Sequence, residues 1–98
     1  MSGQPFSADQ AFLWGMVNEL CEPADLMPRV LAAARTICDN APIAVRQVKK
    51  AIHFGLQADL ATGLAFEVQA YDRMISTEDR REGVRAFNEK RKPKFKGL

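Results

Sequence analysis

The chain has 98 residues and a formal net charge of +2; 47% of its residues are hydrophobic and 27% are charged. A chain of this length forms one domain at most and buries only about two thirds of its unfolded surface, which favours a small domain or an oligomer. No apolar run approaches the roughly 20 residues that a membrane-spanning helix needs, so a membrane protein is not expected. The excess of basic charge lies in residues 89–98, so a nucleic-acid-binding surface over the rest of the chain is not expected either.

Hydrophobic periodicity and capping residues predict an all-α chain of about five helices. The expected helices cover residues 7–15, 25–39, 42–56, 59–76 and 77–91, and residues 92–98 are expected to form a basic tail. In the first helix, Ser7 followed by Gln10 is a capping-box pattern, and Gly15 suits the left-handed residue that ends a helix. The residues after Gly15, up to position 21, are expected to be extended.

The second and third helices are each marked by a proline near the start. Asp25 is a suitable N-cap and places Pro28 in the first turn, where its missing N–H leaves no hydrogen bond unmade. Pro42 opens the third helix in the same way. Each helix carries one apolar stripe at helical spacing, which predicts one buried face.

The fourth helix, with Asp59 as its N-cap, is apolar over more of its surface than the others. Its non-polar residues extend past half of its circumference; they are Leu60, Gly63, Leu64, Phe66, Val68, Ala70, Tyr71 and Ile75. Such a helix is buried on more than one side. In a chain this short, the second side is expected to meet another subunit or a missing domain.

The last helix is predicted to begin after Thr77, with acidic residues in its first turn that interact favourably with the helix dipole. Only Gly83, Val84 and Phe87 are expected to face inward. Pro93 is expected to end the helix, because proline cannot continue it.

The two cysteines, Cys21 and Cys38, form no CxxC pair, and no histidine or cysteine lies close enough to them in sequence to suggest a metal site. We expect two buried free thiols in a reducing compartment and no bound metal. The first ten residues are polar and show no pattern of a secretory signal, so a cytoplasmic location is expected.

Three segments carry a resemblance to a known family. Residues 3–18 are similar to its G-x-x-x-S-A-x-x-A-x-x-x-G-L-V-N stretch, with Met16 in place of the leucine. Residues 40–50 are similar to its N-A-P-x-A-V…K helix, and residues 76–93 to its closing T-E-D-x-x-E-G-x-x-A-F-x-E-K-R-x-P pattern. In this order and spacing, the segments resemble the C-terminal helical portion of the enoyl-CoA hydratase/isomerase (crotonase) family.

The resemblance implies a parent protein that hydrates or isomerises an enoyl-CoA thioester, with coenzyme A carried by the substrate and no separate cofactor. In that family, two backbone N–H groups stabilise an enolate oxygen and two glutamates transfer protons. Those groups lie upstream of the matching segments, so the resemblance implies no catalytic residue in this chain. It implies instead a role in oligomerisation and in partial enclosure of the coenzyme A site.

Two residues match positions that contact coenzyme A in the family, often from a neighbouring subunit. They are Tyr71 on the fourth helix and Lys90 in the closing pattern. An ammonium group attracts phosphate, and an aromatic ring packs against adenine or the pantetheine arm. Core packing of Tyr71 and simple solvation of Lys90 remain the alternatives. The other basic residues of the tail, Arg91, Lys92, Lys94 and Lys96, are expected to be solvated.

A replacement reaction site within these residues is not expected. Glu67 falls in the apolar stripe of its helix, where burial would make it a candidate base or the partner of a structural ion pair. His53 falls on a polar face with Arg46 and Lys49, as a solvated residue does. A stand-alone helical interaction module without catalysis is the alternative function. A nucleic-acid binder is disfavoured because charge alone supports it.

Overall fold

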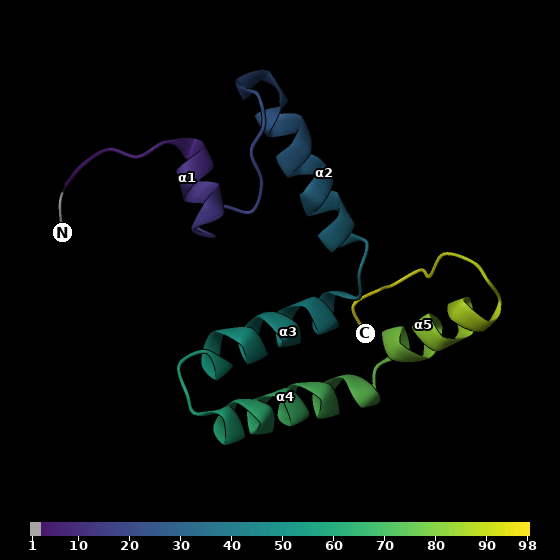
Figure 1. Cartoon of the computed structure of the whole chain (residues 1–98). Coiled ribbons are helices and arrows are strands. Elements are labelled where there is room, and N and C mark those ends of the chain that lie inside the picture. Colours follow the sequence, from purple (N-terminus) through teal and green to yellow (C-terminus); the bar gives the residue numbers. More distant parts are fainter. Residues whose placement is uncertain (1–2) are drawn as a thin grey trace. The chain divides into compact units, whose positions relative to one another are not determined.

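The computed structural model describes residues 3–98, and within this range the secondary structure is helical without β-strands (Figure 1). The elements in chain order are α1 (Ala8–Leu13), the 3-10 helix η1 (Pro23–Asp25), α2 (Leu26–Cys38), α3 (Pro42–Gly55), α4 (Leu60–Ile75) and α5 (Glu78–Asn88). The predicted all-α class with five α-helices is confirmed. None of the described helices is long and apolar enough to cross a membrane. The chain divides into two compact units, which meet in sequence between Ala33 and Ala34.

In the first unit, α1 has the ends that its sequence predicts. The hydroxyl of Ser7 accepts a hydrogen bond from the N–H of Gln10 at 3.1 Å, which satisfies one free N–H of the first turn. Gly15 has a φ of +72° and follows the last turn. Its N–H donates to Phe12, and the N–H of Met16 donates to Ala11, which together form a Schellman motif.

The entry to α2 differs from the prediction. Asp25 is not an N-cap but the last residue of η1, whose first residue is Pro23. The proline fixes its own φ and favours a tight first turn, so the chain is already helical when it reaches Leu26. Pro28 nevertheless lies in the first turn of α2, as predicted. Arg29 of this helix forms an ion pair with Glu19.

In the second unit, α3 and α4 pack against each other as an antiparallel hairpin (Figure 1). Pro42 is the first residue of α3, and Asp59 caps α4 by accepting the N–H of Thr62 at 3.1 Å. The helices approach closely at the turn between them. A side chain at Gly55 would lie 3.6 Å from the Cα of Gly63, so the missing side chains allow this backbone contact.

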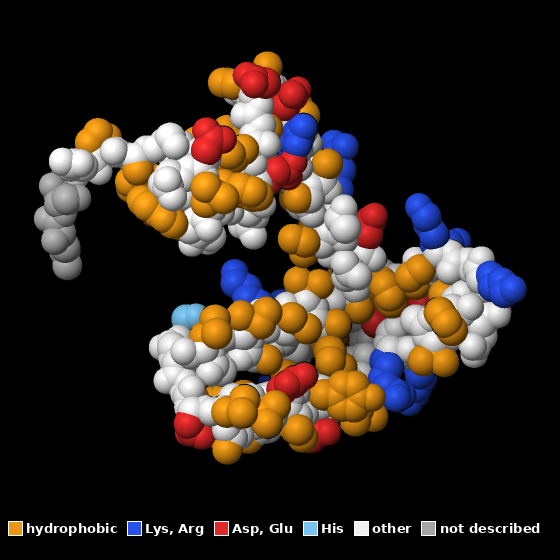
Figure 2. All heavy atoms as spheres, in the orientation of Figure 1, with side chains coloured by type: hydrophobic (Ala, Val, Ile, Leu, Met, Phe, Trp, Pro, Cys, Tyr) orange, Lys and Arg blue, Asp and Glu red, His pale blue; other side chains and the backbone are white. Residues whose placement is uncertain are grey.

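The hairpin leaves much of its apolar surface uncovered. Ala70 and Ala86 are the only apolar side chains buried among the described residues. The stripe of α4 is open, with Leu60 79% exposed and Val68 59% exposed. Hydrophobic side chains accordingly cover much of the visible face of α3 and α4 in Figure 2. The second unit therefore has too small a core to bury the apolar faces that its sequence encodes.

Two predictions about burial are wrong. The thiols are free, but Cys21 is only half-buried and Cys38 is exposed. On α5, Val84 and Phe87 are exposed, the latter by 83%, whereas Asp79 and Ala86 are buried. The returning C-terminal segment lies against α5 on the face that carries Asp79 and Gly83.

Candidate functional site

Tyr71 lies on α4 at the border of two hollows, and half of its surface is exposed. The larger hollow, of ≈ 490 Å³, follows the α3–α4 pair and is mainly apolar, with Val48, Ile52 and Leu60 among its lining residues. The smaller, of ≈ 210 Å³, lies where Phe95 meets α3, α4 and α5. Tyr71 is therefore available for contact and is not enclosed in a core of this chain.

Lys90 occupies an unusual backbone conformation. It has a φ of +53° and is the only residue other than glycine with a positive φ in the described chain. Its N–H donates to Phe87 at 3.2 Å, and the N–H of Arg91 donates to Ala86 at 3.0 Å. These two bonds form a Schellman motif with lysine where glycine is usual. The helix ends at Asn88 because of this turn, and the prediction that Pro93 ends it is wrong.

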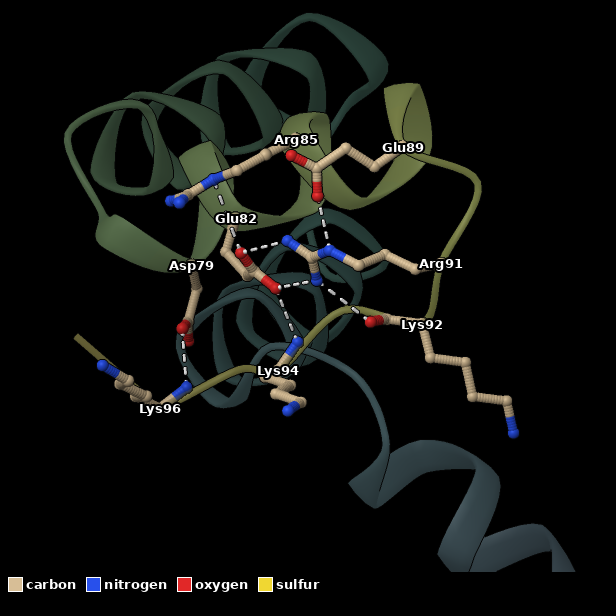
Figure 3. Close-up of polar contacts among 8 residues, drawn as sticks. All are labelled: Asp79, Glu82, Arg85, Glu89, Arg91, Lys92, Lys94 and Lys96. Carbon is tan, nitrogen blue, oxygen red and sulfur yellow. Dashed lines mark hydrogen bonds and ion pairs between the residues drawn. The ribbon is translucent and has the colours of Figure 1, made fainter.

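Arg91 holds the turn to α5 (Figure 3). Its guanidinium donates to both carboxylate oxygens of Glu82, at 2.6 and 3.0 Å, and its Nε donates to Glu89 at 2.6 Å. The backbone N–H of Lys94 donates to the same Glu82 carboxylate at 2.9 Å. The hydrogen bonds from Arg91 and Lys94 lower the pKa of Glu82 to about 2. The carboxylates of Glu82 and Glu89 in turn raise the pKa of Arg91.

A second carboxylate anchors the end of the segment. Asp79, which is 3% exposed, accepts the backbone N–H groups of Lys96 and Gly97, each at 2.7 Å. The N–H of Asp79 donates to the main-chain oxygen of Leu98 at 3.2 Å. A buried carboxylate is costly unless it is hydrogen-bonded, and the tail amides supply these bonds.

The backbone of the C-terminal segment, residues 91–98, is therefore held to α5, which its basic charge did not predict. Its backbone runs back along α5, and Phe95 lies over Gly83, where an added side chain would be 3.6 Å from the ring. The side chains of Lys92, Lys94 and Lys96 remain exposed. In Figure 3, Lys92 extends away from the helix. The segment is a strap with a fixed backbone and a basic outer surface.

The other candidate residues give no reaction site. Glu67 borders the larger hollow but is exposed, so it lacks the burial that would make it a candidate base. His53 is exposed, as predicted, and its ring nitrogen lies 3.2 Å from the side-chain nitrogen of Gln57. Within the described residues, no group of three histidine, cysteine or acidic side chains could hold a metal ion.

Tyr71 lines both of the hollows described above, and Lys90 lines neither of them. The residues that sequence analysis missed are those that anchor the C-terminal segment to α5: Asp79, Glu82 and Arg91. A signal for two of them was present, because Asp79 and Glu82 are three positions apart and therefore share a face of α5. Their partners are backbone N–H groups up to 18 residues away, which no local pattern predicts.

Comparison with known proteins gives a consistent result. All 98 residues match the family model described as "Enoyl-CoA hydratase/isomerase". The chain is 50% identical over 97 residues to YngF of Bacillus subtilis, a protein named as an enoyl-CoA hydratase/isomerase. This match covers 99% of the present chain and 37% of that protein. It is 44% identical over 91 residues to the short-chain-enoyl-CoA hydratase of Clostridium acetobutylicum, where the match covers 93% of this chain and 35% of the relative.

The fold is similar as well. The crystal structure of an enoyl-CoA hydratase from Bacillus anthracis matches with a TM-score of 0.90 at 45% sequence identity. This match covers 93% of the present chain and 35% of the crystallised one. The chain thus spans little more than a third of the length of the relatives that it matches.

Proposed function

The chain belongs to the enoyl-CoA hydratase/isomerase family, and from that premise we propose that it supplies the C-terminal helical part of a protein that hydrates or isomerises an enoyl-CoA thioester. Its part in that function is to complete the protein, by association and by closing one side of the coenzyme A site. The reaction groups come from the rest of the family fold, which this chain does not span.

One observation carries this proposal: the helices expose the apolar faces that a folded protein normally buries. Large side chains along α2 and α4 are 43–79% exposed; they are Leu26, Met27, Val30, Leu31, Ile37, Leu60, Leu64, Val68, Tyr71 and Ile75. Burial of apolar surface contributes about 25 cal/mol per Å². Faces of this extent therefore favour association with a second copy or with the remaining two thirds of the family fold.

Coenzyme A contact is the finer part of the proposal. Tyr71 is half exposed beside an apolar hollow, where a ring can pack against adenine or the pantetheine arm. Lys90 is exposed at the end of α5, with its ammonium group free to approach a phosphate. Both residues are accessible, as a contact with coenzyme A requires.

Reconstitution tests the proposal. The chain is mixed with the remaining, N-terminal two thirds of the Clostridium acetobutylicum short-chain-enoyl-CoA hydratase, and loss of the conjugated thioester absorbance of crotonyl-CoA is followed. We expect no turnover from either part alone and turnover from the mixture. Sedimentation of the chain by itself measures self-association over the same concentration range.

A matched pair of variants makes the test specific to the α4 face. Leu64→Glu places a charge in the exposed stripe and is expected to reduce association and turnover at least tenfold. Gln69→Glu adds the same charge elsewhere on α4 and is expected to leave both within twofold. A chain that stays monomeric at every concentration and fails to restore turnover would contradict the proposal. Turnover by the chain alone would contradict the absence of reaction groups.

A further inference from the structure

The segment that ends α5 combines a strained residue, a two-carboxylate anchor and the proposed coenzyme A contact. Lys90 adopts a left-handed backbone conformation that glycine adopts without cost, because glycine has no Cβ. Glycine would make the same turn more easily but would carry no ammonium group. A non-glycine residue persists in this region of conformational space only when its surroundings enforce it.

The surroundings of Lys90 are well defined. The residue before it, Glu89, and the residue after it, Arg91, are joined by a hydrogen bond from Nε of Arg91 at 2.6 Å. The guanidinium of Arg91 is fixed to Glu82 by two further bonds, two turns earlier on α5. A guanidinium that forms parallel bonds to a carboxylate has both its position and its plane determined. The backbone on both sides of Lys90 is thus tied to the rigid helix.

We propose that Glu82 and Arg91 are positioning residues for coenzyme A binding: by clamping the turn, they hold the Lys90 side chain in the direction in which it meets a phosphate of the ligand. This inference rests on the proposed function, because it assigns to Lys90 the phosphate contact described above. The ion pair between Glu82 and Arg91 acts through Lys90 and does not touch the ligand.

The arrangement gives a role to the ion pair between Glu82 of α5 and Arg91 of the strap. Glu82 is only partly exposed, with 15% of its side-chain surface accessible, and it also accepts the N–H of Lys94. If either partner is lost, the turn can relax and α5 can continue or fray beyond Asn88. Lys90 then samples several directions, and only one of them suits the ligand. The affinity falls by the same factor as the fraction of time that this productive direction is populated.

The experiment uses the isotope-labelled 98-residue chain with coenzyme A as the probe. Two readouts are measured independently by NMR. The first is the state of the turn, from the carbon chemical shifts of residue 90, which report its φ, and from the hydrogen-exchange rate of the Arg91 amide. The second is the dissociation constant of coenzyme A, from titration of the amide resonance of residue 90. The variants are Glu82→Gln and Lys90→Gly, alone and combined, with Glu78→Gln as the charge-matched control on the same helix.

In Glu82→Gln, we expect the positive-φ shifts of Lys90 to be lost, the Arg91 amide to exchange about tenfold faster, and coenzyme A to bind about three- to tenfold more weakly. Lys90→Gly keeps the turn, because glycine favours it, but loses about tenfold in affinity. The combined variant binds no more weakly than Lys90→Gly alone, since Glu82 acts only through Lys90. Glu78→Gln stays within twofold in both readouts.

The outcomes separate the inference from the function on which it rests. If Glu82→Gln loosens the turn while affinity is unchanged and Lys90→Gly still weakens binding, the positioning role is wrong and the proposed contact stands. Additive losses of affinity in the combined variant also overturn the positioning role, because they show that Glu82 affects binding independently of Lys90. If Lys90→Gly has no effect, or the chain does not bind coenzyme A at millimolar concentration, the proposed contact itself fails.

Discussion

At the scale of single residues, the carboxylates of α5 have the largest consequences. Asp79 and Glu82 accept the backbone N–H groups of the strap, and Glu82 also binds Arg91. The sequence indicated for Asp79 only a charge favourable to the helix dipole, and it indicated no role for Glu82. In the structure they determine where residues 91–98 lie, so one face of a short helix organises the whole C-terminal segment.

The strap is predicted to open in acid, and the sign follows from the pKa of Glu82. Its ordinary value of 4.5 falls to about 2 in the folded chain, through hydrogen bonds from Arg91 and Lys94. A lowered pKa means that the ionised group stabilises the fold above the ordinary value, and that this contribution is lost progressively as pH falls from about 4.5 toward 2.

The amide resonance of Lys94 measures this transition, because its N–H donates to the Glu82 carboxylate. We expect its shift to titrate with a midpoint near the lowered pKa of about 2. The same amide in Glu82→Gln should show no such transition. A midpoint near 4.5 in the wild-type chain would mean that the Arg91–Glu82 pair is not formed in solution.

At the scale of the elements, the junction between α4 and α5 depends on one side chain. The hydroxyl of Thr77 donates to the carbonyl oxygen of Met74 at 2.7 Å and accepts the N–H of Arg80 at 3.2 Å. It therefore satisfies one group at the end of α4 and another at the start of α5. Because no residue other than Ser76 and Thr77 separates the helices, this cap also sets the direction in which α5 leaves α4.

Removing this cap should destabilise the second unit. Thr77→Ala removes the side-chain acceptor of the Arg80 N–H and one of the donors to the Met74 carbonyl, which still accepts the N–H of residue 77, and it is expected to lower the free energy of unfolding by about 1 kcal/mol. Thr77→Ser keeps the oxygen and should retain most of the stability. Thermal unfolding followed by helical circular dichroism measures both variants. Equal stability of the alanine and serine variants would show that the hydroxyl does not cap α5.

The α3–α4 hairpin shows how element packing can leave a face unused. The helices meet along the side where Gly55 and Gly63 allow close approach and where Ala70 is buried. The stripe predicted from Leu60, Leu64 and Val68 points elsewhere and stays exposed. Periodicity correctly identified that α4 has an apolar face, but it could not assign the partner of that face.

At the scale of the whole molecule, stability is expected to depend on concentration. A buried leucine replaced by alanine costs about 2–5 kcal/mol, whereas a substitution at an exposed site usually costs within about 0.5 kcal/mol. Leu64 is 52% exposed in the isolated chain, so Leu64→Ala should cost little when the chain is dilute. At concentrations where the α4 face is covered by association, the cost should rise.

Thermal unfolding of the wild-type chain and of Leu64→Ala at two concentrations, a hundredfold apart, measures this change. The difference between the two proteins should increase with concentration, because binding that is specific to the folded state stabilises it by mass action. A loss of several kcal/mol already in the dilute sample would show that Leu64 belongs to a core within the chain itself.

The sequence alone determined the features that depend on neighbours along the chain. The caps at Ser7, Asp59 and Thr77 and the turn at Gly15 are formed by side chains or backbone groups within a few positions of one another, and the family resemblance rests on the same local segments. These could be predicted because each is decided by hydrogen bonds and dihedral preferences inside one turn of helix.

Only the tertiary structure decided which face of α5 is buried and what becomes of the basic tail. Lys90 gives no local sign that it will adopt a positive φ, because lysine disfavours it, and the bonds that reward this conformation join Arg91 to Glu82 and Gly97 to Asp79 across 9 and 18 positions. Pairings at such separations depend on the whole path of the chain. They turn a segment that composition marks as solvated into the strap that presents Lys90.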